Sequence, residues 1–192
     1  MKKAIIFIGL LGFLIPHLSG CTAVVGAGAA VGVTAFQERG IKGRAKDLKI
    51  EAMVLESFIS EELLLLATIG VEVYESRVLL TGASKDKSIT DKAIKLSWAI
   101  EGVKEVINEI QTHNSTSIID FSKDSWITAQ MRSKLTFDIN VYSINYSIET
   151  VNGTVYLIGI AQDDTEHNIV KQYASQIKFV NRVISHVRIK TK

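Results

Sequence analysis

The chain has 192 residues, of which 47% are hydrophobic, with a formal net charge of +2 and a single cysteine. So small a net charge argues against a polycation built to bind nucleic acid, and one cysteine excludes an intrachain disulfide framework. A chain of this length suits one medium-sized domain or two small ones.

The N-terminus has the pattern of a secretory signal. Lys2 and Lys3 precede an apolar run over residues 4–15, and Leu18-Ser19-Gly20-Cys21 follows. Because the apolar run is too short for a comfortable membrane span, we expect residues 1–20 to be a cleaved signal peptide. Leu-Ser-Gly-Cys resembles the bacterial lipobox, which implies that Cys21 becomes the new N-terminus and is acylated. The alternative is an ordinary signal peptide followed by a chance cysteine.

Residues 21–46 are expected to be a lipidated, flexible tether. Residues 22–34 are almost all Ala, Val and Gly, which suits either a flexible spacer or a segment that lies against lipid. Residues 37–46 are polar and basic. They are either a solvated linker or a set of cations near anionic headgroups, at up to about 1 kcal/mol each. Loss of Lys2 and Lys3 brings the formal charge of the mature chain from +2 to 0.

An internal repeat organises the rest of the chain. Displacement by 77 residues aligns residues 47–110 with 124–187 without a gap. Identical pairs include Asp47/Asp124, Glu72/Glu149, Gly82/Gly159, Asp86/Asp163 and Val106/Val183. We therefore expect two copies of one module, at residues 47–112 and 123–192, with a polar linker at 113–122.

Each module is predicted to have the element order α-β-β-α-β. Asp47 and Asp124 are expected to cap the first helices, which run to about Phe58 and Leu135. Asn152-Gly153 between two apolar runs is a strong hairpin signal. The expected strands cover residues 68–74, 77–83 and 103–110, and then 145–151, 154–160 and 180–189. The fold class is therefore α+β, with a three-stranded sheet and two helices in each module.

The second helix of each module is predicted from an amphipathic stripe. Ser88 and Thr165 are aligned candidates for the helix caps. The shared inward positions, at i, i+3, i+4 and i+7, indicate a helix that packs on a sheet. These positions are Ala93/Val170, Leu96/Tyr173, Ser97/Ala174 and Ile100/Ile177.

These motifs resemble the BON domain. The resemblance is carried by Val78-Leu79-Leu80-Thr81-Gly82, by its counterpart at 155–159, and by Gly102-Val103 with Val106. Two such domains behind a lipobox are similar to the dual BON-domain lipoproteins, and the similarity covers nearly the whole mature chain. One departure is Phe179, which stands where the first copy has Gly102. A residue that needs no special backbone angle can replace glycine there if the turn relaxes, so this departure leaves open the geometry at the start of that strand and not the fold.

The resemblance implies a non-enzymatic protein on the periplasmic face of a Gram-negative outer membrane. It implies binding of anionic phospholipid and support of envelope integrity, with envelope proteins as further partners. Thr22, not Asp, follows the cysteine, which favours sorting to the outer membrane.

No catalytic, metal or cofactor site is predicted. His113, His167 and His186 lack metal-ligand spacing with supporting carboxylates. Residues 26–28, Gly-Ala-Gly, lack the strand-turn-helix setting of a dinucleotide site. With Cys21 acylated, no thiol remains as a nucleophile. We therefore expect no enzyme activity.

Charge and one tryptophan distinguish the second copy. Residues 45–119 hold 8 Lys+Arg and 12 Asp+Glu, net −4, whereas residues 121–192 hold 9 and 6, net +3. Trp126 aligns with Lys49 and precedes the inward Ile127, so its ring is expected to face outward. An outward Trp near a lysine suits a membrane interface, although packing on the other module is the alternative. The predicted lipid-binding residues are Trp126, Lys123, Arg132 and Lys134.

A second apolar pair is predicted to lie between the modules. Ile94 and Trp98 are four residues apart, meet on one helix face, and lie off the shared core stripe. We expect the second module to cover them, with a partner protein as the alternative. The alternative function is accordingly a periplasmic protein-interaction adaptor or chaperone-like module.

Overall fold

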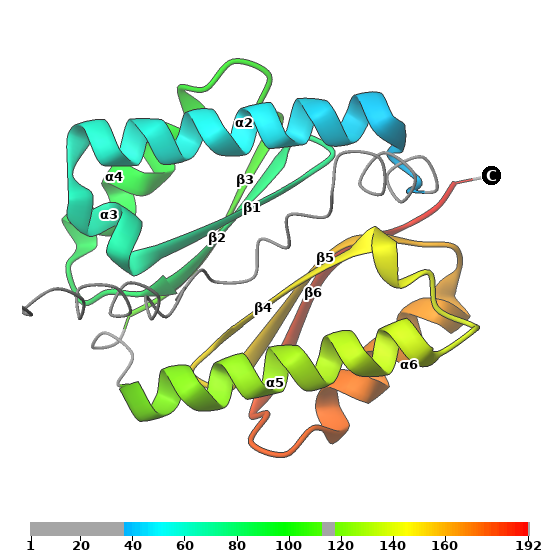
Figure 1. Ribbon diagram of the computed structural model, residues 1–192. Coiled ribbons are helices and arrows are strands. Elements are labelled where there is room, and N and C mark those ends of the chain that lie inside the picture. The colour runs from blue at the N-terminus through cyan, green and yellow to red at the C-terminus, as the bar shows by residue number, and fades with distance from the viewer. Residues whose placement is uncertain (1–36, 113–117, 192) are drawn as a thin grey trace, which may run out of the picture.

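The computed structural model describes residues 37–112 and 118–191. The predictions for the signal peptide, Cys21 and residues 113–117 lie outside the described residues. Within them, each half of the chain forms its own three-stranded sheet covered by helices (Figure 1). The α+β class and the two-module division of the fold are confirmed.

The two modules repeat one topology. The first consists of α2 (Gly40–Glu61), α3 (Leu63–Thr68), β1 (Ile69–Tyr74), β2 (Arg77–Ala83), α4 (Lys87–Trp98) and β3 (Glu105–Gln111). The second consists of α5 (Ile118–Phe137), the 3-10 turn η1 (Ser143–Asn145), β4 (Tyr146–Val151), β5 (Thr154–Ala161), α6 (Asp164–Gln176) and β6 (Arg182–Ile189). Each middle strand, β2 or β5, pairs antiparallel with the strand before it and parallel with the last strand.

The prediction that Asp47 and Asp124 cap helices is wrong, because both bind β-hairpin turns. Both α2 and α5 begin well before them, so both carboxylates project from helix interiors and are buried. Asp124 accepts the Asn152 N–H at 2.7 Å and the Gly153 N–H at 2.8 Å. Asp47 does the same for the corresponding turn of the first module. Each aspartate thus satisfies two amides that a tight turn leaves without a strand partner.

The caps of the second helices are also aspartates. Asp86 accepts the Ser88 N–H at 2.8 Å, and Asp163 accepts the Glu166 N–H at 2.9 Å. Ser88 and Thr165 are therefore not the caps, because α4 and α6 begin at residues 87 and 164. Asp86 and Asp163 each lie two residues upstream of the predicted cap. Both fit the N-cap preference for a short oxygen-bearing side chain.

The helices bury their inner faces on one side of each sheet. Ile50, Val54 and Phe58 pack with β1, β2 and α4 in the first module. Ile127, Met131 and Leu135 pack equivalently in the second. Gly82 and Gly159 of the Val-x-Leu-x-Gly motifs lie against the backbone carbonyl oxygens of Thr68 and Asn145, which leave no space for a Cβ. That close approach explains why the motif ends in glycine.

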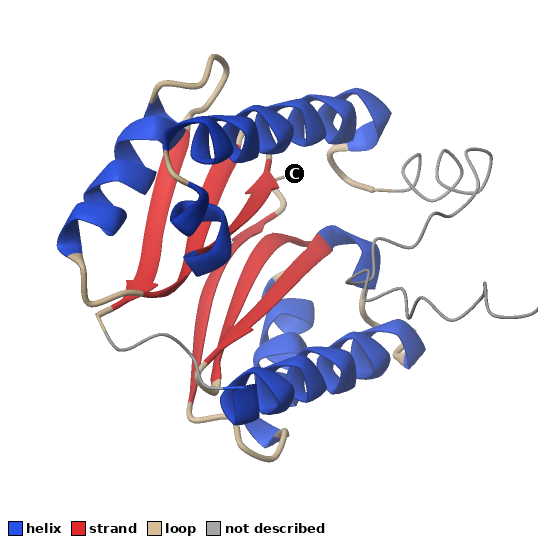
Figure 2. Ribbon diagram, turned by 60° about the vertical axis from the view of Figure 1, so that its left-hand side comes forward, coloured by secondary structure: helices blue, strands red, loops and turns tan. Residues whose placement is uncertain are grey.

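The opposite faces of the two sheets pack on each other (Figure 2). The helices therefore form the two outer layers of the molecule and the sheets form the two inner layers. Buried side chains from both modules make this interface: Tyr74, Leu79, Ile107, Tyr156, Ile158 and Ile160. The middle strands are consequently buried along their whole length, as expected for strands covered on both sides.

The prediction that Ile94 and Trp98 form the domain interface is wrong. Ile94 packs against the core of its own module, and Trp98 is 52% exposed. Both belong to α4, which lies on the outer side of the first sheet, whereas the second module covers the inner side.

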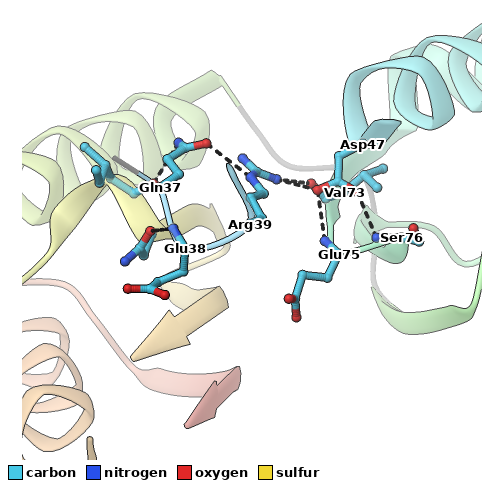
Figure 3. Close-up of polar contacts among 9 residues, drawn as sticks. Gln37, Glu38, Arg39, Asp47, Val73, Glu75 and Ser76 are labelled. Atoms are coloured by element: carbon cyan, nitrogen blue, oxygen red, sulfur yellow. Dashed lines mark hydrogen bonds and ion pairs between the residues drawn. The ribbon is translucent and has the colours of Figure 1, made fainter. Parts of the chain in front are cut away.

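The segment that enters α2 contacts both modules (Figure 3). Gln37 donates from Nε2 to the Ile144 carbonyl oxygen at 2.9 Å, and the Glu38 N–H donates to Asn145 Oδ1 at 3.0 Å. The buried Arg39 guanidinium binds Asp47 at 2.8 Å and the Val73 carbonyl oxygen at 3.0 Å. Residues 37–46 are therefore ordered structure. They are not a solvated linker, and Arg39 is not free to meet headgroups.

Candidate functional site

The outward face of α5 carries apolar side chains that the core does not use. Ile127, Met131 and Leu135 turn one side of the helix into the core, so Trp126 is left on the other side. Phe137, three turns further along, comes back to nearly the same direction because α-helices repeat every 3.6 residues. Trp126 is 43% exposed and Phe137 is 84% exposed. One face of α5 thus exposes two aromatic rings, those of Trp126 and Phe137.

Trp126 packs edge-on against a second exposed aromatic ring, that of Phe179. The ring centroids are 6.0 Å apart and the planes are inclined by 71°, which is the favoured edge-to-face arrangement of aromatic pairs. Phe179 follows α6 and comes from the same module. Trp126 therefore packs within its own module, and the alternative that it packs on the first module is wrong.

The predicted basic residues do not form one cluster. Lys123 is exposed, one turn before Trp126, and makes an ion pair with Asp120 at 3.3 Å. Lys134 Nζ lies 5.3 Å from the centre of the Tyr173 ring, on the α6 side of α5. Arg132 turns to the other side, where Nη2 donates to the Ile148 carbonyl oxygen of β4 at 3.4 Å. Lys178, which was not predicted, lies 4.7 Å above the Phe179 ring.

The loop after α5 exposes a further apolar residue in an ordered setting. Ile139 is 95% exposed. Its neighbour Asp138 accepts the Tyr173 hydroxyl at 2.7 Å and the Asn140 N–H at 2.8 Å, and these hydrogen bonds hold the pKa of Asp138 below its usual range. Val141 is buried in the core. Because the loop is held on both sides, the exposure of Ile139 follows from the fold.

A pair of carboxyl groups lies near the contact between the two sheets. Glu72 of β1 and Glu149 of β4 occupy the same position in the two copies, and their carboxyl groups are close enough to interact. Burial, together with the Glu72 charge, raises the pKa of Glu149 to about 7, and Arg132 opposes the shift. Burial likewise raises the pKa of Glu51 of α2, and the nearby Glu72 charge adds to this shift. These groups belong to the interface and not to the exposed face of α5.

Within residues 37–112 and 118–191, no three His, Cys, Asp or Glu side chains are arranged to hold a metal ion. No helix in the same residues has the length and apolar character needed to cross a bilayer.

Two tandem α-β-β-α-β modules with a Val-x-Leu-x-Gly motif in each define a protein built from small, duplicated domains. The BON domain model matches residues 46–114 and 123–191, and the chain belongs to the BON-domain family.

Similar proteins come from several bacteria. The outer membrane lipoprotein DolP of Haemophilus influenzae is 32% identical over 187 residues, which are 96% of this chain and 94% of that protein. An uncharacterized protein in the gshII 5′ region of Anaplasma centrale is 42% identical over 127 residues, 65% of this chain and 83% of that protein. The osmotically-inducible protein Y of Escherichia coli is 23% identical over 146 residues, 75% of this chain and 73% of that protein.

Four residues of the exposed surface were not predicted from the sequence: Phe137, Ile139, Lys178 and Phe179. One signal was present: Phe179 stands where the first copy has glycine. Phe137 is the last residue of α5, beyond the predicted helix end, whereas Lys178 and Ile139 lie after helices, in loops whose geometry the sequence does not give.

Proposed function

We propose that this chain is a non-enzymatic outer-membrane lipoprotein. In this proposal Cys21 carries the acyl anchor, the two BON domains lie on the periplasmic face, and the second domain binds anionic phospholipid. The chain would thereby support the integrity of the envelope. The similarity to an outer membrane lipoprotein over 96% of the chain supports the location.

The outward position of Trp126 on α5 is the main observation that supports lipid binding by the second domain. An indole ring that is partly exposed beside a lysine suits a bilayer interface, where its apolar body enters lipid and its N–H stays hydrated. The second module also has a net charge of +3 against −4 for the first. Anionic lipid therefore attracts the second module and repels the first, within a Debye length of about 8 Å at physiological salt.

The anchor leaves α5 free to reach the same membrane. Fifteen residues, 22–36, lie between Cys21 and Gln37, where the described chain begins. A chain of that length spans at most about 50–60 Å, which exceeds the length of about 30 Å expected for the 20-residue helix α5. Trp126 can therefore contact the bilayer that holds the acyl chains, and a contact between tethered partners gains from a high effective concentration.

The test is binding of the chain without its lipidated cysteine, residues 22–192, to vesicles with and without anionic phospholipid. Trp126→Ala should weaken binding at low and at high salt, because insertion of a ring is local and apolar. Lys123→Glu should weaken binding mainly at low salt, because the Lys123 charge acts through a screened field. Gln130→Ala is the matched control, since Gln130 is exposed one turn after Trp126 on the same helix. Equal binding by Trp126→Ala and the unchanged chain would defeat the proposal.

The exposure of Trp98 favours a second candidate function, a periplasmic adaptor that binds a protein through α4. A half-exposed Trp on an outer helix leaves a large apolar ring in contact with water, and such exposed rings are typical of interaction sites. Vesicle binding unaffected by Trp126→Ala, together with loss of envelope integrity in cells carrying Trp98→Ser, would support the adaptor in place of the lipid binder.

A further inference from the structure

Phe179 has a backbone conformation that disfavours phenylalanine. Its φ is +72°, in the left-handed region, and the aligned residue of the first module is Gly102 with φ +92°. Side chains with a Cβ rarely adopt such angles because the Cβ crowds the following carbonyl group. The turn therefore does not relax around Phe179, which keeps the left-handed conformation of the glycine that it replaces.

The turn is held by hydrogen bonds that both modules make. The Val180 N–H donates to the Ile177 carbonyl oxygen at 3.2 Å, and the Asn181 N–H donates to the Gly153 carbonyl oxygen at 2.8 Å. At the positions 77 residues earlier, Val103 and Lys104 make the same two bonds, to Ile100 at 3.3 Å and Ser76 at 2.9 Å. The fold thus requires the left-handed residue, and glycine meets that requirement without strain.

Burial of the Phe179 side chain does not offset the strain in its backbone. The side chain is 47% exposed and is absent from the buried clusters of the second module. Its described ring contacts are the edge of Trp126 and the ammonium group of Lys178. Backbone strain that persists where a simpler residue would fold as well is a mark of function.

We propose that Phe179 is a second membrane-inserting ring, which acts with Trp126 as one aromatic pair on the surface of an anionic phospholipid bilayer. The inference rests on the proposed lipid-binding function and adds a residue to that site. The chemistry fits a bilayer because the exposed rings are accompanied by two exposed ammonium groups, Lys123 one helical turn from Trp126 and Lys178 over Phe179. The rings enter the headgroup boundary while the ammonium groups remain at the level of the phosphates.

The experiment compares Phe179→Gly with Phe179→Ala in the chain without its lipidated cysteine, residues 22–192. Both variants remove the ring, but only glycine relieves the backbone strain. We expect both to bind vesicles of anionic phospholipid about five- to tenfold more weakly, the effect of losing the insertion of a half-exposed phenyl ring. We expect the Tm of Phe179→Gly to exceed that of Phe179→Ala by about 2–4 °C. Phe179→Trp should retain binding.

The outcomes separate this inference from the proposed function. If Trp126→Ala loses binding while Phe179→Gly binds as the unchanged chain does, lipid binding stands and the role of Phe179 is refuted. If neither substitution changes binding, the proposed function itself fails. Equal Tm values for the glycine and alanine variants would refute the strain on which the argument depends.

Discussion

Glu109 and His186 occupy the same position in the two copies, 77 residues apart, and they meet across the interface between the sheets. Glu109 Oε1 lies 2.8 Å from His186 Nε2. Glu72 and Glu149 are a second pair of equivalent residues in contact. Equivalent residues touch each other only close to a two-fold axis, so the two modules pack as the subunits of an isologous dimer would. The duplicated chain therefore contains, within one molecule, the interface of a symmetric pair.

The position of this interface gives a stability prediction. Ile158→Ala should lower the free energy of unfolding by about 2–4 kcal/mol, because Ile158 is fully buried between the sheets. Trp98→Ala, on the exposed side of α4, should cost less than about 1 kcal/mol. Urea unfolding of both variants is the measurement. A larger loss for Trp98→Ala than for Ile158→Ala would contradict the interface described.

A second prediction concerns the aspartates beneath the hairpin turns. Asp124→Ala leaves the amides of Asn152 and Gly153 without their buried acceptor. The free energy of unfolding should therefore fall by about 2–4 kcal/mol. Asp91→Ala is the control, because Asp91 is exposed and paired only with Lys87 in the described contacts. The free energy of unfolding of that control should stay within about 0.5 kcal/mol of the value for the unchanged chain. Similar midpoints for the two variants in urea would show that Asp124 does not hold the turn.

The carboxyl pair of Glu72 and Glu149 predicts a pH dependence. Burial raises the pKa of Glu149 from 4.5 to about 7 in the folded chain, so the folded state holds a proton that the unfolded state has lost. The stability from this group is complete below about pH 4.5 and falls as the pH rises through about 7. Glu149→Gln should remove this decline, because an amide stays neutral while it meets Glu72.

The measurement is the free energy of unfolding from pH 4.5 to 8. Carboxyl groups with lowered pKa values, such as Glu105 beside Arg77, act in the opposite sense and at lower pH, so they do not mask the decline. Glu56→Gln, an exposed position on α2, serves as the control. An unchanged slope in Glu149→Gln would exclude Glu149 as its source.

The lipid anchor is tested at Cys21. Cys21→Ser should leave an uncleaved or mislocalised soluble species, because acyl chains supply about 0.8 kcal/mol per buried CH2 and nothing replaces them. Mass spectrometry of the mature protein should find an acylated Cys21 at the N-terminus. An unmodified cysteine retained within the chain would end the lipoprotein interpretation.

The sequence by itself determined the duplication, the strands and the family. The strands were predicted to within two residues at most ends because apolar periodicity and Asn152-Gly153 are local signals. The outward direction of Trp126 was also readable, since Ile127 beside it aligns with a core residue of the other copy. These features depend on neighbours in the chain, and two aligned copies show which positions are shared.

Only the tertiary structure decided how the modules meet and what surrounds Trp126. The interface could not be found from differences between the copies, because a two-fold contact uses equivalent positions, such as Ile107 and Ile184, that are apolar in both. Ile94 and Trp98 differ between the copies and lie elsewhere. The aromatic pair of Trp126 and Phe179 joins residues 53 positions apart, and the strain at Phe179 comes from hydrogen bonds to a distant turn. Such contacts follow from the packed fold and leave no periodic trace in the sequence.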